Sequence, residues 1–312
     1  MLKSTRDAYG EALLKLGEKD PRVVVLDADL SSSTRSSRFA GRFPERFFEV
    51  GIAEQNLYGV AAGLAASGKV PFASTFAVFA TERAFNQIRQ SIAYPNLNVK
   101  IVSSHSGFTA SGDGGSHQTL IDVGLMRCLP NMTVIVPADA VQAEQAVLAA
   151  AEHRGPVYLR MGKSEVPVLC DPAAPFRIGE AVSLRSGRDV SVLVTGTLLG
   201  PALEAAETLE GEGVSVELLS VHTVKPLDRE RILRSARKTG AVVTVEEHSV
   251  IGGLGSAVAE LLAAEHPVPM AFVGVNDVFG ESGSEGELYA AHGLTSAGIS
   301  EKTRALLERR RG

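Results

Sequence analysis

Several features are scarce in this sequence of 312 residues, and each scarcity argues against a class of protein. The two cysteines, Cys128 and Cys170, form no C-x-x-C pair, so neither a disulfide framework nor a thiolate metal site is expected. No apolar run approaches 18 residues, and the first residues, MLKSTRD, lack the apolar core of a signal peptide. We therefore expect a cytoplasmic protein that has no membrane contact and whose own side chains bind no metal.

Positive charge is also in short supply. The chain has 31 Lys and Arg against 36 Asp and Glu, which gives a formal net charge of −5. Proteins that bind nucleic acid by displacing counterions usually present a basic face, so nucleic acid is not an expected partner. If the ligand is an anion, a few well-placed cations must hold it.

Short apolar runs, which predict strands, alternate with amphipathic segments of about ten residues, which predict helices. In the first half, strands are expected at 23–26, 71–74, 99–102, 133–137 and 157–160, and helices at 7–18, 55–66, 81–92 and 141–151. In the second half, strands are expected at 190–194, 214–219, 241–245 and 270–273, and helices at 202–211, 228–239 and 256–265.

This alternation predicts an α/β protein with two doubly wound domains and parallel sheets. Prolines are concentrated in residues 166–176, which indicates a connection between the domains. We place the domains at 1–171 and 172–312. In such sheets, ligands bind at the carboxyl ends of the strands, so functional residues should lie in the loops that follow them.

The segment 103–118, SSHSGFTASGDGGSHQ, is the most informative part of the chain. His105 and His117 bracket a loop with four glycines, and glycine allows the backbone to approach a ligand closely. Histidine can move protons near neutral pH. The pattern therefore favours a ligand-binding loop over its alternative, a flexible surface loop with incidental histidines.

Three other segments are ambiguous when residue types alone are considered. Glu54 opens an Ala- and Gly-rich helix, where a carboxylate can simply complement the helix dipole. Phe76 and Phe79 stand three apart in a turn, and core packing would explain both. The segment 253–258, GLGSAV, nearly fits a dinucleotide fingerprint, but it stands beyond its strand and ends in Val. We interpret it as a glycine-rich helix start.

Together these segments resemble the transketolase family, and the resemblance covers essentially the whole chain. The family's pyrimidine-binding domain carries Gly-Ile-x-Glu, Thr-Phe-x-x-Phe and Gly-x-Asp-Gly-x-x-His-Gln motifs. They match residues 51–54, 75–79 and 112–118 in the same order. Residues 221–228 and 252–255 look like the family's C-terminal domain. The resemblance implies a thiamine-diphosphate pyrimidine-binding domain followed by a transketolase C-terminal-like domain.

The motif of the family's diphosphate-binding domain is not found. It consists of Gly-Asp-Gly followed further on by Asn, whereas the Gly-Asp-Gly at 112–114 belongs to the histidine loop and no Asn stands near 140. The chain also begins where the middle domain of a full-length transketolase begins. It thus resembles the C-terminal subunit of a split, two-chain transketolase. The resemblance implies an N-terminal partner subunit that holds Mg²⁺ or Ca²⁺ and the diphosphate, in a heterotetramer with two copies of each chain.

The resemblance also implies an activity, the transfer of a two-carbon ketol unit between sugar phosphates in the pentose phosphate pathway. Glu54 matches the carboxyl group that binds N1′ of the cofactor and favours its imino form. Phe76 and Phe79 match aromatic residues that pack on the pyrimidine, and Asp29 matches a residue that helps to hold the loop or the cofactor. A third aromatic residue, common in the family, falls at Glu82 when the sequences are compared without a gap.

The substrate-binding residues follow from the same resemblance. His105 and His117 match histidines that contact substrate oxygens or move protons during carbon–carbon cleavage. Asp113 matches an aspartate that binds a hydroxyl near the reacting carbons. Arginine offers a planar fork of donors that suits phosphate oxygens. The residues that match the phosphate site are Arg6, Ser33, His105 and Arg160.

Other functions remain open at this point. The beta subunit of 2-oxoacid dehydrogenases has the same domain order, but the histidine loop and the phosphate residues argue against it. 1-Deoxyxylulose-5-phosphate synthase shares the loop, but it is usually one long chain. A non-catalytic subunit that only stabilises a partner is disfavoured by Glu54 and the two loop histidines.

Overall fold

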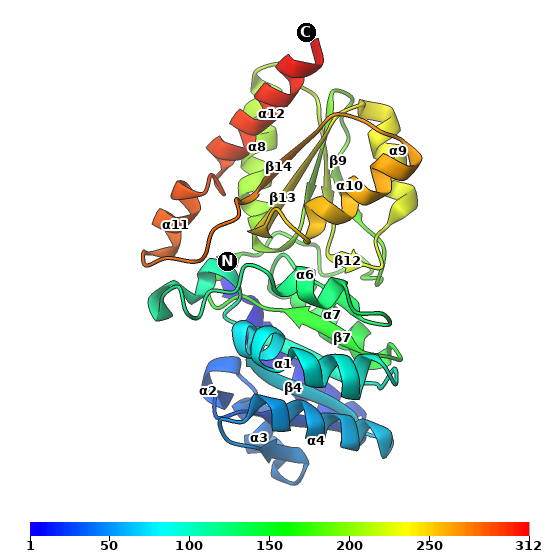
Figure 1. The fold of residues 1–312 in the computed structure, drawn as a ribbon, viewed down its shortest axis with the longest axis vertical. Coiled ribbons are helices and arrows are strands. Elements are labelled where there is room, and N and C mark those ends of the chain that lie inside the picture. The colour runs from blue at the N-terminus through cyan, green and yellow to red at the C-terminus, as the bar shows by residue number, and fades with distance from the viewer. Residues whose placement is uncertain (312) are drawn as a thin grey trace.

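The computed structural model describes residues 1–311, which form two α/β units stacked along the long axis (Figure 1). The first unit contains a seven-stranded sheet and the second a five-stranded sheet. The predicted fold class, two α/β units with largely parallel sheets, is confirmed. None of the described helices is long and apolar enough to cross a membrane.

The seven-stranded sheet has five parallel neighbour pairs and one antiparallel edge strand. In spatial order its strands are β12 (Thr223–Lys225), β6 (Thr133–Ile135), β7 (Val157–Arg160), β5 (Lys100–Ser104), β4 (Val70–Phe76), β2 (Val23–Asp27) and β3 (Phe47–Glu49). The helices of this unit are α1 (Thr5–Lys19), α2 (Ser31–Thr34), α3 (Ser37–Arg42), α4 (Glu54–Ala66), α5 (Phe85–Gln87), α6 (Asp122–Arg127) and α7 (Ala140–Glu152).

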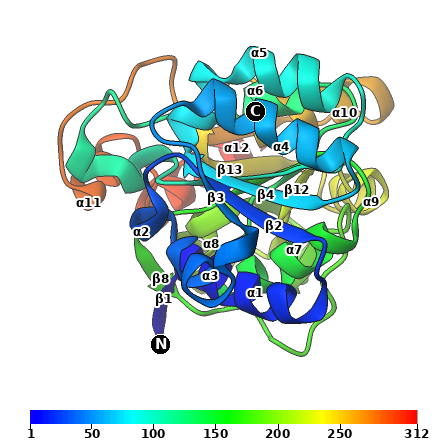
Figure 2. The same cartoon turned by 90° about the horizontal axis from the view of Figure 1, so that it is seen from below.

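Both faces of this sheet are covered, which explains why its strands are continuous apolar runs. Val23 and Val25 of β2 pack in one cluster with residues of α1 and α7, while Val24 and Leu26 pack in another with residues of α4. Figure 2 shows α4 and α5 on one side of the strands and α1 and α3 on the other. Because helices cover both faces of the sheet, the loops that follow the strands are the place where a ligand can bind.

The second unit repeats this architecture with fewer strands. In spatial order they are β14 (Met270–Val275), β13 (Val242–Ser249), β10 (Val190–Val194), β11 (Val216–Ser220) and the antiparallel β9 (Val182–Arg185). Its helices are α8 (Leu199–Gly211), α9 (Arg229–Thr239), α10 (Leu254–Glu265), α11 (Glu285–Ala291) and α12 (Ser296–Arg311). A further short pair, β1 (Leu2–Ser4) with β8 (Glu165–Pro167), forms a separate antiparallel ribbon.

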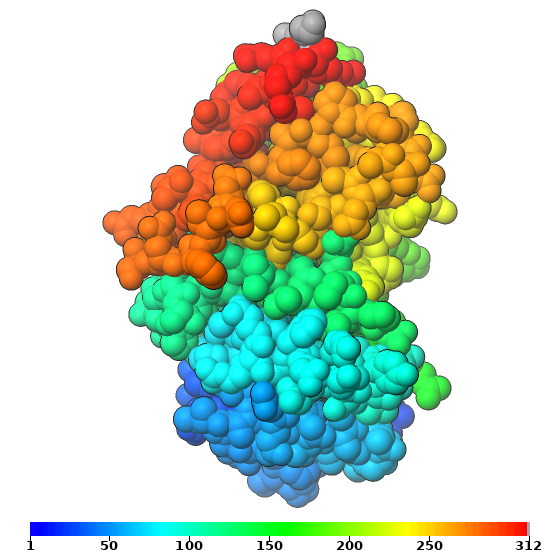
Figure 3. Space-filling model, viewed as in Figure 1, coloured from blue at the N-terminus to red at the C-terminus, as the bar shows by residue number. Residues whose placement is uncertain are grey.

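The second half of the chain contributes to the first sheet. Strand β12 pairs with β6, although it lies after the predicted division at 171/172, so this division does not separate the two sheets completely. Between β14 and α11, a further segment reaches the first unit, where the side-chain amide of Gln118 donates to the carbonyl of Glu281 at 2.9 Å. Figure 3 shows this orange segment lying against the green loop of the first unit.

The helix predicted at 81–92 is interrupted. Phe79–Arg83 and Ile88–Ala93 form wide π-turns on either side of the single turn α5. A π-turn accommodates one extra residue and is frequent at functional sites. The extra residue changes which side chains face the sheet edge, and Glu82 and Arg83 both lie in the first of these turns.

Candidate active site

Most of the predicted site residues lie at the carboxyl edge of the seven-stranded sheet. They come from the loops after β2 and β5, from the end of β4 and the turn after it, and from the starts of α1 and α4, whereas Arg160 ends β7. Three residues other than glycine adopt a left-handed backbone in these loops, with φ of 62° at Asp29, 70° at Arg35 and 54° at His105. Such conformations are costly and persist where surrounding structure imposes them, often at binding sites.

Glu54 is the first residue of α4, and its side chain is only 4% exposed. Its Oε1 accepts a hydrogen bond of 3.1 Å from the guanidinium of Arg83. No described side chain donates to its Oε2, so this oxygen is available to a ligand. A buried carboxylate needs such partners, because burial without them costs several kcal/mol.

The two phenylalanines of the turn after β4 lie beside the histidines. The rings of Phe76 and Phe79 are stacked with centroids 5.9 Å apart. The ring of His105 stacks on Phe76 at 3.8 Å, and His117 meets the edge of Phe79 at 5.4 Å. The structure therefore brings four of the predicted side chains into one aromatic group.

The loop that carries Asp29 and Ser33 is organised by the buried carboxylate of Asp27. This carboxylate accepts hydrogen bonds from the Leu30 amide at 2.7 Å and from the hydroxyls of Thr34 and Ser36 at 2.6 and 2.8 Å. Burial raises the pKa of Asp27 to about 6, although these hydrogen bonds act in the opposite direction. Asp29 and Ser33 are thereby held at the sheet edge, with Asp29 exposed.

Positive charge collects around His105. Burial, followed by the charges of Arg6 and Lys163, lowers the pKa of His105 to about 3, so its ring is neutral at physiological pH. Arg6 donates to the carbonyl of Ser33 at 2.8 Å, and its buried Nε has no partner among the described residues. Lys163 lies 3.6 Å from the carboxylate of Asp113. These positions suit an anionic ligand.

Arg160 does not join this cationic group, contrary to the sequence-based expectation. It is 6% exposed, and its Nε donates to Asp122 at 2.8 Å while its two terminal nitrogens donate to the side chain and the carbonyl of Glu247. Burial alone would lower the pKa of Arg160, but the two carboxylates raise it above its usual value. Its hydrogen bonds tie the first sheet to β13, so we remove it from the phosphate site.

Two basic residues of the site escaped the sequence reasoning. Lys163 stands three residues beyond Arg160, and the presence of a second cation after the same strand was the available signal. Arg83 follows Glu82 in the first π-turn, and its guanidinium lies over Phe79 at 4.6 Å from the ring centroid. Glu82 instead lies near Thr119 and Asp122, and burial raises its pKa.

Metal ligands are not grouped at this site. Among residues 1–311, no three His, Cys, Asp or Glu side chains come close enough together to hold a metal ion.

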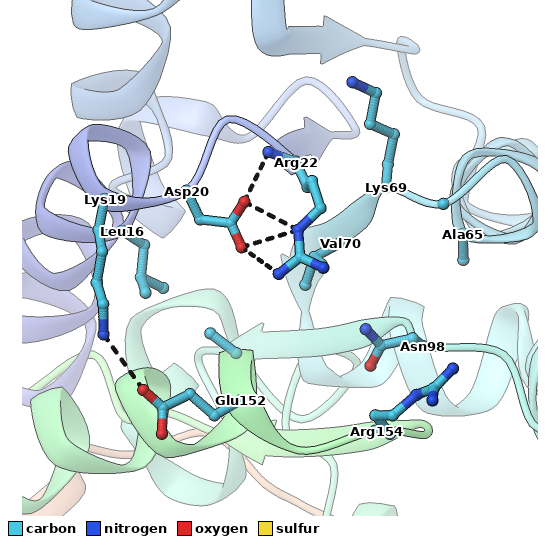
Figure 4. A pocket seen from close by; sticks show the side chains of 12 residues that line it. Leu16, Lys19, Asp20, Arg22, Ala65, Lys69, Val70, Asn98, Glu152 and Arg154 are labelled. Carbon is cyan, nitrogen blue, oxygen red and sulfur yellow. Dashed lines mark hydrogen bonds and ion pairs between the residues drawn. The ribbon is translucent and has the colours of Figure 1, made fainter.

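A separate cavity lies away from these residues. Its volume is about 870 Å³, and it lies between the ends of α1, α4 and α7, near the amino ends of β2 and β4 (Figure 4). Much of its charge is already paired, because Arg22 binds Asp20 and Lys19 binds Glu152. None of the predicted site residues lines it.

Comparison with known proteins identifies the family of both domains. The family model for the transketolase pyrimidine-binding domain matches residues 2–168, and the model for the transketolase C-terminal domain matches residues 179–299. A 6-deoxy-6-sulfo-D-fructose transketolase subunit from Clostridium sp. strain MSTE9 is 47% identical over 305 residues, which are 98% of this chain and 95% of the relative.

Solved structures give the same result. A split-gene transketolase, described as an inactive beta4 tetramer, is 55% identical with a TM-score of 0.92 and covers 98% of both chains. Transketolase from Leishmania mexicana is 25% identical with a TM-score of 0.83, and the match covers 99% of this chain but only 46% of that one. The chain therefore belongs to the transketolase family, in which it corresponds to the C-terminal subunit of a split transketolase.

Proposed function

We propose that this chain is the pyrimidine-binding subunit of a thiamine-diphosphate-dependent transketolase that transfers a two-carbon ketol unit between sugar phosphates. The observation that carries the proposal is the position of Glu54. It is buried with one oxygen free, and Arg83 links its other oxygen to Phe79, which is stacked with Phe76 near the two histidines. A carboxyl group next to an aromatic wall suits a flat heterocycle with a ring nitrogen.

These residues fit the pyrimidine half of the cofactor. Glu54 would hold N1′, and Phe76 and Phe79 would pack on the ring, where aromatic contacts contribute on the order of 1 kcal/mol beyond the area they bury. Asp29 lies on the neighbouring loop and would help to hold the cofactor. When bound, thiamine diphosphate supplies a carbon nucleophile for the ketol unit.

The chain's own residues then bind the sugar and move its protons. His105 is neutral, and its Nδ1 lies 2.9 Å from the Ser104 hydroxyl, which leaves Nε2 to accept a hydrogen bond from a substrate hydroxyl. His117 is the candidate for proton transfer, and Asp113 would bind a hydroxyl of the sugar. The candidates for its anionic end are Arg6, Ser33, Lys163 and His105.

The diphosphate and its Mg²⁺ or Ca²⁺ belong, in this proposal, to the partner subunit. No metal-binding group of side chains occurs in the described chain, and a very similar protein is described as inactive when it forms a tetramer of one kind of chain. We propose a heterotetramer with two copies of each chain, located in the cytoplasm and acting in the pentose phosphate pathway.

Sulfonated sugars are a second substrate candidate, because the relative that acts on 6-deoxy-6-sulfo-D-fructose is 47% identical. Phosphate carries between −1.5 and −2 charges near neutral pH, whereas a sulfonate carries one. Arg6 and Lys163 provide two cations, and each has a carboxylate near it, that of Asp7 and that of Asp113 respectively. Two cations suit the higher charge of the phosphate, and a competition between the two donors would test this preference.

Reconstitution tests the proposal. We expect no ketol transfer from xylulose 5-phosphate to ribose 5-phosphate by the purified chain, and clear transfer after addition of the chain that carries the Gly-Asp-Gly…Asn motif, thiamine diphosphate and Mg²⁺. As a control, pyruvate is offered as the donor with glyceraldehyde 3-phosphate as the acceptor, and this pair should give no product. Robust turnover by the single chain, or condensation of pyruvate by the mixture, would contradict it.

A further inference from the structure

Arg83 makes two contacts at the proposed pyrimidine site, and no role has been assigned to it so far. Its guanidinium donates to Oε1 of Glu54 at 3.1 Å and lies over the ring of Phe79 at 4.6 Å. Both partners are residues that we assign to the cofactor. Arg83 thus joins the carboxyl group and the aromatic wall through one rigid, planar group.

The π-turn explains how Arg83 reaches this place. In a comparison without a gap, the third aromatic residue of the family falls on Glu82. The turn Phe79–Arg83 accommodates one additional residue, so that Arg83 rather than Glu82 faces Glu54. A flat guanidinium stacked on a ring can replace an aromatic side chain as one wall of a pocket.

Glu54 depends on this contact. Arg83 is the only described residue whose side chain donates to the Glu54 carboxylate, which is 4% exposed, whereas Arg83 is 52% exposed. A carboxylate with one fixed oxygen presents its other oxygen in a defined direction. Without Arg83 the carboxylate could rotate, and the direction in which Oε2 meets a ligand would be lost.

We propose that Arg83 is a positioning residue of the pyrimidine site, which orients Glu54 toward N1′ and supplies the pocket wall that an aromatic residue supplies in relatives. This inference rests on the proposed function. It assigns to the pocket a specificity for a flat ring whose edge nitrogen shares a proton with the Glu54 carboxyl group.

The test is calorimetric binding of thiamine diphosphate with Mg²⁺ to the assembled two-chain enzyme. Because Arg83 is half exposed and makes one ion pair and one cation–π contact, R83A should weaken binding about three- to tenfold. R83Y restores a flat wall without the hydrogen bond and should recover part of this loss. R89A is the matched control, because Arg89 is exposed on the same segment and its side chain makes no hydrogen bond within residues 1–311.

A cofactor analogue with carbon in place of N1′ separates positioning from a merely structural role. If Arg83 acts through Glu54, the loss caused by R83A should be smaller with this analogue than with thiamine diphosphate, because only the contribution of the pocket wall remains. An equal loss with both cofactors would refute the positioning of Glu54 by Arg83. Unchanged or tighter binding to R83A would overturn the inference, because Arg83 would then be irrelevant or displaced by the ring.

The same titration separates this inference from the proposed function. If the wild-type assembly binds no thiamine diphosphate, or if E54Q binds it as tightly as wild type does, the proposed function itself fails. If E54Q weakens binding and R83A does not, only the role of Arg83 is refuted.

Discussion

The carboxyl edges of the two sheets are built alike, but their buried polar groups differ in how many hydrogen-bond partners the protein supplies. At the first sheet, Arg6 keeps a buried nitrogen without a partner, and Glu54 keeps one oxygen free. At the second sheet, Glu246 caps α10 by accepting from the amides of Leu254 and Gly255, both at 2.7 Å. The comparison separates a buried carboxylate whose partners come from the protein itself, that of Glu246, from one that keeps an oxygen for a ligand, that of Glu54.

The glycine-rich start of α10 already holds a carboxylate of the protein, that of Glu246. A side chain at Gly253 would place its Cβ 2.0 Å from Oε2 of Glu246, so glycine is required for the carboxylate to reach the helix end. Helix amino termini attract anions, and here the protein supplies its own. The interpretation of this segment as a glycine-rich helix start agrees with this geometry.

The largest expected effect is at the first edge. Glu54→Ala should lower ketol transfer by the assembled enzyme by about 10²- to 10⁴-fold, because the group that faces N1′ is removed. Glu54→Gln should be nearly as harmful, since an amide cannot share a titratable proton with the ring. Steady-state kinetics measure the loss, and light scattering verifies that the assembly still forms. A rate within threefold of wild type would refute the assignment.

Arg160→Ala should act on stability. It leaves the carboxylates of Asp122 and Glu247 buried without their cation, so we expect a loss of about 3–5 kcal/mol in the free energy of unfolding. Urea denaturation of the chain at pH 8 measures it. Any loss of kcat/KM should be the same for phosphorylated donors and for hydroxypyruvate. A loss confined to phosphorylated donors would return Arg160 to the phosphate site.

Lys163→Ala should lower kcat/KM for phosphorylated donors only. It removes one charge-assisted contact to the phosphate, which typically contributes about 1.5–3 kcal/mol. Because Lys163 is partly exposed, we expect the lower end of this range, about a tenfold loss of kcat/KM for phosphorylated donors. Hydroxypyruvate lacks the remote phosphate, so its rate should hardly change. An equal loss for both donors would place Lys163 at the reacting carbons instead.

A separate expected effect is on the pH dependence of stability. The pKa of His105 is about 3 in the folded chain, below its usual value near 6.5, so its contribution to stability is complete above pH 6.5 and is lost as the pH falls toward 3. Between pH 7 and pH 5, wild type should lose about 2 kcal/mol more unfolding free energy than His105→Gln. If wild type and His105→Gln lost the same unfolding free energy between pH 7 and pH 5, the lowered pKa of His105 would be contradicted.

Local patterns predicted most of the fold. The predicted strand at 23–26 is observed as β2, and the predicted helix at 141–151 is observed as α7, because continuous apolar runs and helical periodicity are local properties. The three-residue strand β12 escaped prediction, because it exists only by pairing with β6, some 90 residues earlier. The π-turns escaped too, since one extra residue in a helix leaves no periodic signal.

The sequence predicted which residues lie at the site, but it did not predict which way each side chain points. Glu54, Phe76 and the loop histidines were predicted by motif; the structure brings the histidines against Phe76 and Phe79, and Arg83 links Glu54 to Phe79. Arg160 was misplaced because its direction is decided by Asp122 and Glu247, which lie 38 and 87 residues away in sequence. Residue type identifies a cation, but only tertiary contacts determine which anion it meets.

Hydrogen–deuterium exchange on the assembled enzyme, with and without thiamine diphosphate and Mg²⁺, tests the contrast between the two edges most directly. We predict that the cofactor slows exchange in residues 27–34, 51–58 and 76–83 at the first edge. Exchange in residues 246–256 should stay unchanged, because their polar groups are already satisfied. Protection of 246–256, with none at 51–58, would contradict the account.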